Sequence, residues 1–83
     1  NTHAVKSFIT INDIVLEFKN VIHTQAEVNV FNALGQLQFT KKMWLQNGIQ
    51  ALQIPNFESW SNGTLLLQIK TNTQNYYSKL IKQ

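Results

Sequence analysis

The sequence predicts an all-β fold, a small antiparallel sandwich of seven strands. Residues that favour strands, above all Val, Ile, Thr, Phe and Leu, recur in short runs. Asn, Gly and Ser separate these runs, and several runs alternate apolar and polar residues as half-buried strands do. The predicted strands span residues 7–11, 14–18, 26–32, 36–41, 48–54, 64–71 and 75–82.

The first four runs show this pattern in different ways. Asn12-Asp13 separates the first two runs, which are therefore predicted to form a hairpin. Within the third run, Ala26 to Val30 alternates strictly between apolar and polar residues. Leu37 and Phe39 alternate with polar neighbours in the fourth run, and Gly35 closes the short connection between these two strands.

Turn residues delimit the last three runs. Asn47-Gly48 and Asn62-Gly63 precede the fifth and sixth runs, and both pairs suit a turn with positive φ. Pro55 lacks a backbone N–H and should end the fifth strand. The stretch 72–74 links the last two runs, which are predicted to lie side by side in one sheet. Their packing residues are Leu65, Leu67, Ile69, Tyr76 and Leu80.

The loop after Pro55 carries Phe57 and Trp60, and it is long enough to cover an open end of a sandwich. A single helical turn around residues 58–61 is the only helical structure expected. Seven short strands with regular turns are typical of an immunoglobulin-like β-sandwich.

Length and composition allow one domain. The chain has 83 residues, of which 43% are hydrophobic and 13% charged, so it is too apolar for disorder. Its longest purely apolar run is Leu65 to Leu67, far short of the roughly 20 residues that span a bilayer. The absence of cysteine excludes disulfides and thiolate chemistry. Because the chain starts at Asn1 without a signal-peptide pattern, we expect a cut point in a longer protein.

The net charge of +3 comes from lysine alone. Nucleic-acid binders usually gather Lys and Arg on one face, with Arg making bidentate contacts. Here the lysines are scattered, which predicts no nucleic-acid partner and favours a role in solubility and in protecting sheet edges. They are Lys6, Lys19, Lys41, Lys42, Lys70, Lys79 and Lys82.

Residues that carry out catalysis are few, and no enzymatic activity, cofactor or metal is expected. The carboxylates are Asp13, Glu17, Glu27 and Glu58. Glycosidases need two carboxylates across a cleft, and zinc needs three or four clustered ligands. His3 and His23 stand alone, and the glycine-rich phosphate and nucleophile motifs are missing. Asn62-Gly63-Thr64 is formally an N-glycosylation acceptor, but a turn explains it better.

Two tryptophans leave an alternative function open. Exposed indoles on a β-sandwich can stack on sugars, so Trp44 and Trp60 are compatible with a carbohydrate-binding or adhesive module of a secreted enzyme. The favoured interpretation places both in the core or at its rim. A fibronectin-like spacer is a further alternative, and a spacer would lie in the middle of a longer chain.

Four segments, in order, carry a family resemblance. The first is residues 28–37, where an alternating strand is followed by an aromatic, Asn and Leu-Gly-Gln. The second is the strand at 48–54, the third is 62–69, and the fourth is Tyr-Tyr-Ser-Lys-Leu-Ile-Lys at 76–82. Together they resemble a type A C-terminal sorting domain of the type IX secretion system of Bacteroidetes, over roughly 7–83. Leu65 departs from the family, which usually has Tyr there, and residues 1–6 look like a linker remnant.

This resemblance implies a function as a sorting signal that directs cargo across the outer membrane to the cell surface or beyond. The implied partners are the outer-membrane translocon and the sortase-like components of the system, and the domain is removed or retained after export. A weak homodimer through open sheet edges is a further expectation. Recognition by the machinery is expected at Gly63, Tyr76, Lys79, Leu80, Ile81 and Lys82, and a structural turn role at Gly35, Gly48 and Gly63.

Overall fold

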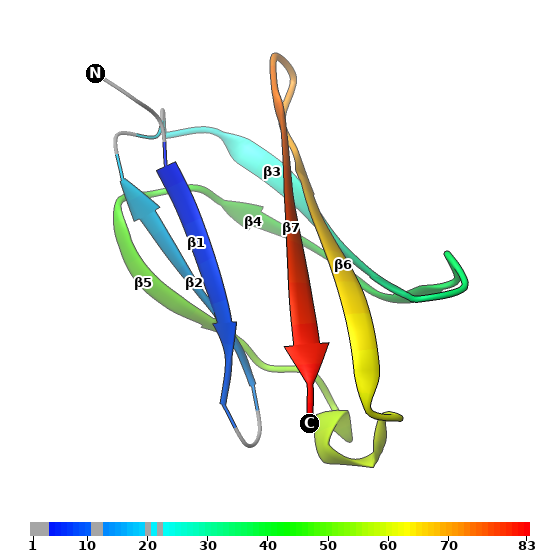
Figure 1. Ribbon diagram of the computed structural model, residues 1–83. Helices are drawn as coiled ribbons and strands as arrows, with labels where there is room; N and C mark the ends of the chain where they lie inside the picture. Colours follow the sequence, from blue (N-terminus) through cyan, green and yellow to red (C-terminus); the bar gives the residue numbers. More distant parts are fainter. Residues whose placement is uncertain (1–3, 11–12, 20, 22) are drawn as a thin grey trace.

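The computed structural model describes residues 4–10, 13–19, 21 and 23–83. Two antiparallel sheets pack face to face (Figure 1), which confirms the predicted all-β, immunoglobulin-like sandwich. The strands are β1 (Ala4–Ile9), β2 (Ile14–Lys19), β3 (Gln25–Asn32), β4 (Leu37–Trp44), β5 (Gly48–Leu52), β6 (Gly63–Lys70) and β7 (Asn75–Lys82). Asn1, His3, the predicted strand end at Ile11 and the predicted turn residue Asn12 lie outside the described residues.

The smaller sheet has three strands in the order β1-β2-β5. Its central strand, β2, buries Ile14, Leu16 and Phe18, whereas Val15 and Glu17 between them are only half-buried. This alternation follows from strand geometry, in which successive side chains point to opposite faces. One face of the sheet therefore belongs to the core and the other faces solvent.

The larger sheet has four strands in the order β4-β3-β6-β7. Its last two strands pair from Gly63 opposite Lys82 to Lys70 opposite Asn75, so the predicted adjacency of the two C-terminal strands is confirmed. The amide of Thr71 donates to the carbonyl of Gln74 at 2.8 Å and closes their hairpin. β7 is an edge strand, with β6 as its only hydrogen-bonded neighbour in the sheet.

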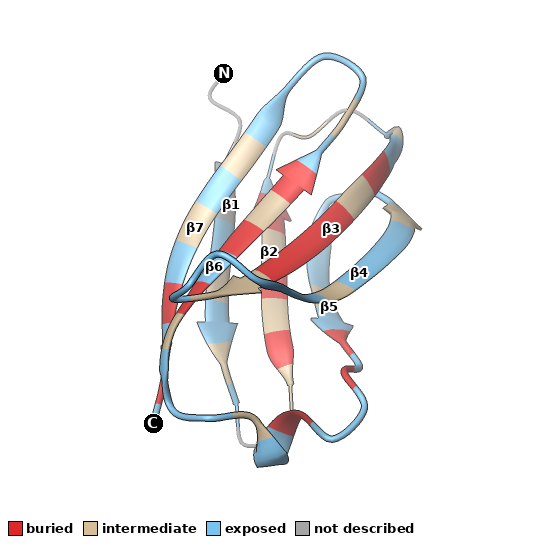
Figure 2. Cartoon of the chain, turned by 90° about the vertical axis from the view of Figure 1, so that its right-hand side faces the viewer, coloured by how far each residue is buried: buried red, intermediate tan, exposed pale blue. Residues whose placement is uncertain are grey.

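The core lies between the sheets and consists mainly of aliphatic and aromatic side chains. Figure 2 shows its buried residues alternating with half-buried ones along β2 and with half-buried or exposed ones along β6. Burial of this continuous apolar layer is the main driving force for folding in a domain of this size. The core residues are Ile14, Leu16, Phe18, Ala26, Val28, Val30, Leu45, Leu52, Ile54, Phe57, Leu65, Leu67, Ile69 and Leu80.

A single 3₁₀ turn, η1 (Phe57–Ser59), closes one end of the sandwich (Figures 1 and 2). It begins one residue before the turn that the sequence predicts, because Phe57 is fully buried and anchors the segment to the core. Trp60 packs edge-on against Phe57, with 5.1 Å between the ring centroids. Among the described residues, no helix approaches the length that a bilayer crossing requires.

Several strand boundaries differ from those predicted, three of them for a clear structural reason. β1 begins at Ala4, so residues 4–6, which we expected in a linker, pair with β2. β4 continues to Trp44, because Gln25 at the start of β3 offers it a partner. β5 ends at Leu52, before Pro55, and Ile54 instead turns into the core and accepts a hydrogen bond from the Phe57 amide.

Candidate functional site

The residues expected to be read by the secretion machinery lie on two paired strands. Gly63 begins β6 and faces Lys82 across the ladder, and the other members lie on β7. The fold thus brings them to one edge of the larger sheet. Gly63 has a φ of 138°, a value that side chains rarely tolerate, so only glycine enters this strand without strain.

Strand alternation divides this set into two sides. Leu80 and Lys82 are buried and Tyr76 is half-buried against the core, whereas Lys79 and Ile81 point to solvent. Ile81 keeps 61% of its surface exposed. The outward side also carries Tyr77, which is 72% exposed and which we did not predict as a site residue. The period-two pattern of β7 contains the signal, because Tyr77 shares its parity with Lys79 and Ile81.

Lys82 makes internal contacts despite its charge. Its ammonium Nζ donates to the carbonyl of Trp60 at 2.9 Å and to Oδ1 of Asn62 at 3.4 Å. The same Nζ lies 5.5 Å from the ring centroid of Phe57, within the range of a cation–π contact. A buried ammonium is tolerated only when such partners replace water. Lys82 therefore fastens the end of β7 to the loop that closes the sandwich.

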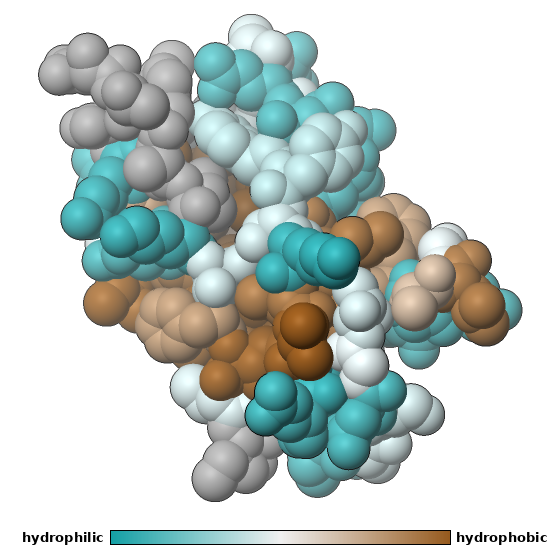
Figure 3. Space-filling model, viewed as in Figure 1, coloured by the Kyte–Doolittle hydropathy of each residue, from teal (hydrophilic) through white to brown (hydrophobic). Residues whose placement is uncertain are grey.

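The free side of β7 lies beside β1, the edge strand of the other sheet (Figure 1). The hydroxyls of Ser7 and Ser78 form a hydrogen bond of 2.6 Å between the two sheets. This contact links the two ends of the described chain and positions β7 as a fixed element. Figure 3 shows hydrophobic surface over the lower part of β7 and the neighbouring β1.

The β3–β4 connection is a rigid loop organised by one side chain. Oδ1 of Asn32 accepts hydrogen bonds from the amides of Leu34 at 2.9 Å and Gln36 at 3.0 Å, and its Nδ2 donates to Oε1 of Gln36 at 2.8 Å. Gly35 adopts a φ of 81°, which suits glycine. This geometry gives the Asn-Ala-Leu-Gly-Gln segment a physical meaning, since it holds Leu34 at the tip with 82% of its surface exposed.

The outer face of the larger sheet carries three bands that cross its strands. Their members face one another in the strand register, so their side chains lie on the same side of the sheet. The apolar band is Leu37, Phe31 and Leu66 with Lys79 at its end. The amide band is Thr40, Asn29, Gln68 and Tyr77, and the charged band is Lys42, Glu27, Lys70 and Asn75.

The amide band forms a chain of hydrogen bonds across all four strands. Thr40 Oγ1 donates to Asn29 Oδ1 at 2.7 Å, and Asn29 Nδ2 donates to Gln68 Oε1 at 3.2 Å. Gln68 Nε2 reaches the Tyr77 hydroxyl at 3.5 Å. Asn29 is only 6% exposed and also donates to Glu27 Oε2 at 2.9 Å. The chain fixes the Asn29 side chain, because a buried amide must keep its partners.

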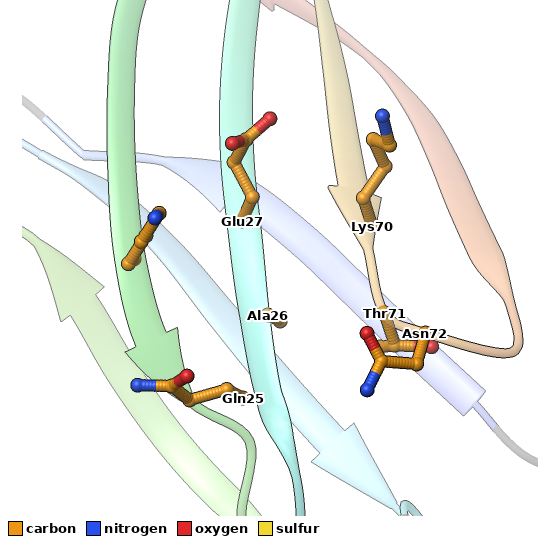
Figure 4. A pocket seen from close by; sticks show the side chains of 7 residues that line it. Gln25, Ala26, Glu27, Lys70, Thr71 and Asn72 are labelled. Atoms are coloured by element: carbon orange, nitrogen blue, oxygen red, sulfur yellow. The ribbon is translucent and has the colours of Figure 1, made fainter.

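The charged band borders a shallow polar hollow of about 230 Å³, seen in Figure 4 with Glu27 and Lys70 on neighbouring strands. It contains a single carboxylate, and paired acid–base chemistry requires two. Glu17 lies on the outer face of the other sheet, and Asp13 and Glu58 lie in connections. Among the described residues, no cluster of three His, Asp or Glu side chains could hold a metal ion.

The two tryptophans occupy different environments. Trp60 is half-buried and packs against the core, as predicted. Trp44 lies at the end of β4, is 54% exposed and is not among the residues packed against the core, so the expectation that it lies in the core or at its rim is wrong. The ring of His23 lies 5.0 Å from Trp44, tilted by 49°, and covers part of the indole. Trp44 is exposed because β4 is an edge strand and Trp44 pairs with Gln25 on the outer face.

Comparison with protein families yields one match. The family model described as the secretion system C-terminal sorting domain matches residues 5–83. Comparisons with curated proteins and with solved structures find no significant match. The match includes every strand of the sandwich, the Asn32 loop and the C-terminal hairpin. The chain therefore belongs to the family of C-terminal sorting domains of the type IX secretion system, which mark proteins for export across the outer membrane to the cell surface or beyond.

Proposed function

We propose that this domain acts as a folded, non-catalytic ligand that the outer-membrane translocon and then the sortase-like components of the type IX system recognise. The observation that carries the proposal is the family match across residues 5–83 together with the position of β7 at a sheet edge. A small sandwich keeps its shape at the end of any cargo, and the outward side chains of β7 are open to a receptor although β1 lies along its free edge.

The exposed side of the C-terminal strand supports direct reading by a receptor. Lys79 and Ile81 project to solvent, Ile81 opposite Thr64 beside Gly63, whose lack of a side chain leaves the backbone open, and Lys79 opposite Leu66. Leu80 and Lys82 contribute indirectly, because their buried side chains hold the strand in place. Tyr76 is intermediate, since its ring packs on the core while its hydroxyl donates to Gln74 Oε1 at 2.6 Å.

The first test fuses residues 1–83 to a periplasmic reporter in a type IX-competent bacterium. Deletion of residues 79–83 should leave the reporter in the periplasm, and normal surface display of the truncated fusion contradicts the proposal. Because this deletion also removes the buried Leu80, a second variant, Lys79→Ala with Ile81→Ser, changes only exposed side chains. It should lower display while the purified domain keeps its wild-type midpoint of denaturation.

Removal and retention are separate outcomes of export. We propose that the sortase-like component acts after translocation on the connection that precedes the sandwich, leaving the domain intact. Mass spectrometry of the released fragment tests this step, since a fragment that starts near β1 supports removal. A surface-attached fusion that still carries the whole domain shows retention instead.

Self-association through sheet edges remains a prediction. The edges of β4 and β5 lie on the opposite side of the sandwich from β1 and β7. Lys41 and Lys42 project from β4, and lysines on an edge strand disfavour pairing with another copy. We therefore expect association to be weak, and sedimentation velocity at increasing concentration measures it.

The exposure of Trp44 favours a second candidate function, that of a carbohydrate-binding module. The indole is partly covered by His23, which reduces the flat area that a sugar ring needs. A glycan panel with the isolated domain and its Trp44→Ala variant separates the two functions. Binding that depends on Trp44 favours the module, and absence of binding leaves the sorting signal as the sole candidate.

A further inference from the structure

The apolar band is an unusual feature for the solvent face of a sheet. Leu37 is 53% exposed and Leu66 is 44% exposed, and the half-buried Phe31 lies between them in the register. Leu66, Phe31, Tyr77 and Lys79 also line a groove of about 450 Å³ whose walls are mostly apolar. Monomeric proteins usually cover contiguous apolar surface, so a patch of this kind indicates an interaction site.

The apolar band continues to the hairpin tip. Leu37 follows the Asn32 loop directly, and the register shifts between Val30 and Phe31, as at a β-bulge. A bulge increases local twist and redirects the strand. Figure 1 shows the β3–β4 tip extending away from the sandwich on the right, and Figure 3 shows hydrophobic surface there. Leu34 thus adds an exposed apolar side chain at the tip that Leu37 follows.

Both parts of this surface are preorganised. The hydrogen-bond chain of the amide band lies next to the groove, and buried Asn29 holds Gln68, one of the groove residues. The Asn32 side chain holds the loop that presents Leu34. A rigid surface loses little conformational entropy on binding. Less of the free energy gained from its apolar contacts is therefore lost in ordering the surface.

The charges on the outer face of the larger sheet indicate which kind of partner would bind there. The charged band and the apolar band carry Lys42, Lys70 and Lys79 against one carboxylate, Glu27, which already accepts a hydrogen bond from Asn29. Among the described residues of the apolar band, no carboxylate faces Lys79. A second copy of the chain would present the same excess of lysine, and like charges across an interface oppose binding.

We propose that the apolar band with Leu34 is a docking surface for a partner protein segment whose aliphatic or aromatic side chains are flanked by carboxylates. This proposal rests on the proposed function, and the partner is then a component of the export machinery. The apolar side chains would fill the groove beside Phe31 and Leu66, and a carboxylate would meet Lys79.

The test measures surface display of the reporter fused to residues 1–83. The variant Leu34→Ser with Leu66→Thr removes exposed apolar surface and keeps a strand-forming residue on β6. The matched control is Phe8→Thr with Ile49→Thr, because those residues are 48% and 67% exposed on the outer face of the other sheet. We expect display to fall at least about tenfold in the first variant and to stay near wild type in the control, as loss of interface anchors predicts.

Substitutions of Lys79 that reverse or keep its charge test whether the partner presents a carboxylate to this residue. Lys79→Glu should lower display severalfold, whereas Lys79→Arg keeps the charge and should retain it. Each purified variant is checked for a wild-type denaturation midpoint, so that a loss of display reports recognition. If wild-type residues 1–83 fail to export the reporter, the proposed function fails. If wild-type residues 1–83 export the reporter, and the leucine variant and Lys79→Glu export it equally well, the docking surface is refuted while the proposed function stands.

Two further experiments test whether the docking surface binds a second copy of the chain or a lipid membrane instead of a partner protein. Sedimentation velocity of the purified domain shows whether a second copy covers the face, and flotation with phosphatidylethanolamine–phosphatidylglycerol vesicles shows whether lipid does. Self-association or vesicle binding that the leucine variant abolishes overturns the proposal of a partner protein. A monomer that does not float, with display lost as expected, supports it.

Discussion

The end of β7 and the tip of the β3–β4 hairpin are both short, near a strand terminus, and rich in family motif residues, yet they are stabilised differently. The end of β7 is fixed by tertiary contacts, through buried Leu80 and the Lys82 contacts with the η1 loop. The hairpin tip is fixed by its own atoms, through Asn32 and Gln36. Substitutions of the buried Leu80 or Lys82 should therefore alter stability and export together, whereas substitution of the exposed Leu34 should alter export alone.

The largest effect is expected at Leu80. Truncation to Ala leaves a cavity between β7 and the core, and large-to-small changes of this kind cost about 3 kcal/mol. Chemical denaturation of the purified domain measures the loss. Its neighbour Ile81→Ala is the matched control, since Ile81 is exposed and should change stability by less than about 0.5 kcal/mol. Equal effects at the two positions would contradict the assigned sides of β7.

A smaller effect is expected at Lys82. Replacement by Ala removes the charged donor to the Trp60 carbonyl and the contact over Phe57, at a cost of about 2 kcal/mol. Lys79→Ala on the same strand removes an exposed lysine and should be nearly neutral. The difference between the denaturation midpoints of the Lys82 and Lys79 variants tests whether the Lys82 contacts stabilise the end of β7. A Lys79 variant that is as unstable as the Lys82 variant would show that the loss of a positive charge, and not the loss of the Lys82 contacts, lowers stability.

Asn32 should contribute less again. Asn32→Ala leaves the amides of Leu34 and Gln36 without their side-chain acceptor, and we expect a loss of about 1 kcal/mol. Asn32→Asp keeps an acceptor for both amides and should retain most of the stability. Amide hydrogen exchange in the 32–36 loop provides a local readout. Unchanged exchange in the Ala variant would show that Asn32 does not organise the tip.

The smallest effect on stability is expected at Leu34. Since 82% of its surface is exposed, Leu34→Ser should shift the free energy of unfolding by less than about 0.5 kcal/mol. Thermal or chemical denaturation checks this expectation. A marked loss of stability would mean that the tip packs on the domain, and the contrast with β7 would then disappear.

The sequence predicts the strands well because their signals are local. Period-two alternation and Asn-Gly turns mark the elements, and the pairing of β6 with β7 follows from the short link at 72–74. The end of β4 at Trp44 was missed, because it depends on Gln25 as a partner across the sheet. Edge position and pairing partner are tertiary properties that no local pattern contains.

The candidate site was less predictable, for reasons that particular residues make clear. Lysine is usually exposed, and Lys82 is buried only because a loop more than 20 residues away supplies the Trp60 carbonyl. Leu34 lies in the connection that Gly35 closes, and its exposure depends on the conformation that Asn32 imposes. The three bands arise from the register of four strands, which the sequence alone does not specify.

The most direct test of the export role is whether the wild-type chain is sufficient for sorting. Residues 1–83 fused to a periplasmic reporter should make that reporter accessible to external protease in a type IX-competent strain, and only there. An isogenic strain that lacks the translocon should keep the same fusion in the periplasm. A fusion whose domain folds cooperatively but stays in the periplasm of both strains would contradict the account.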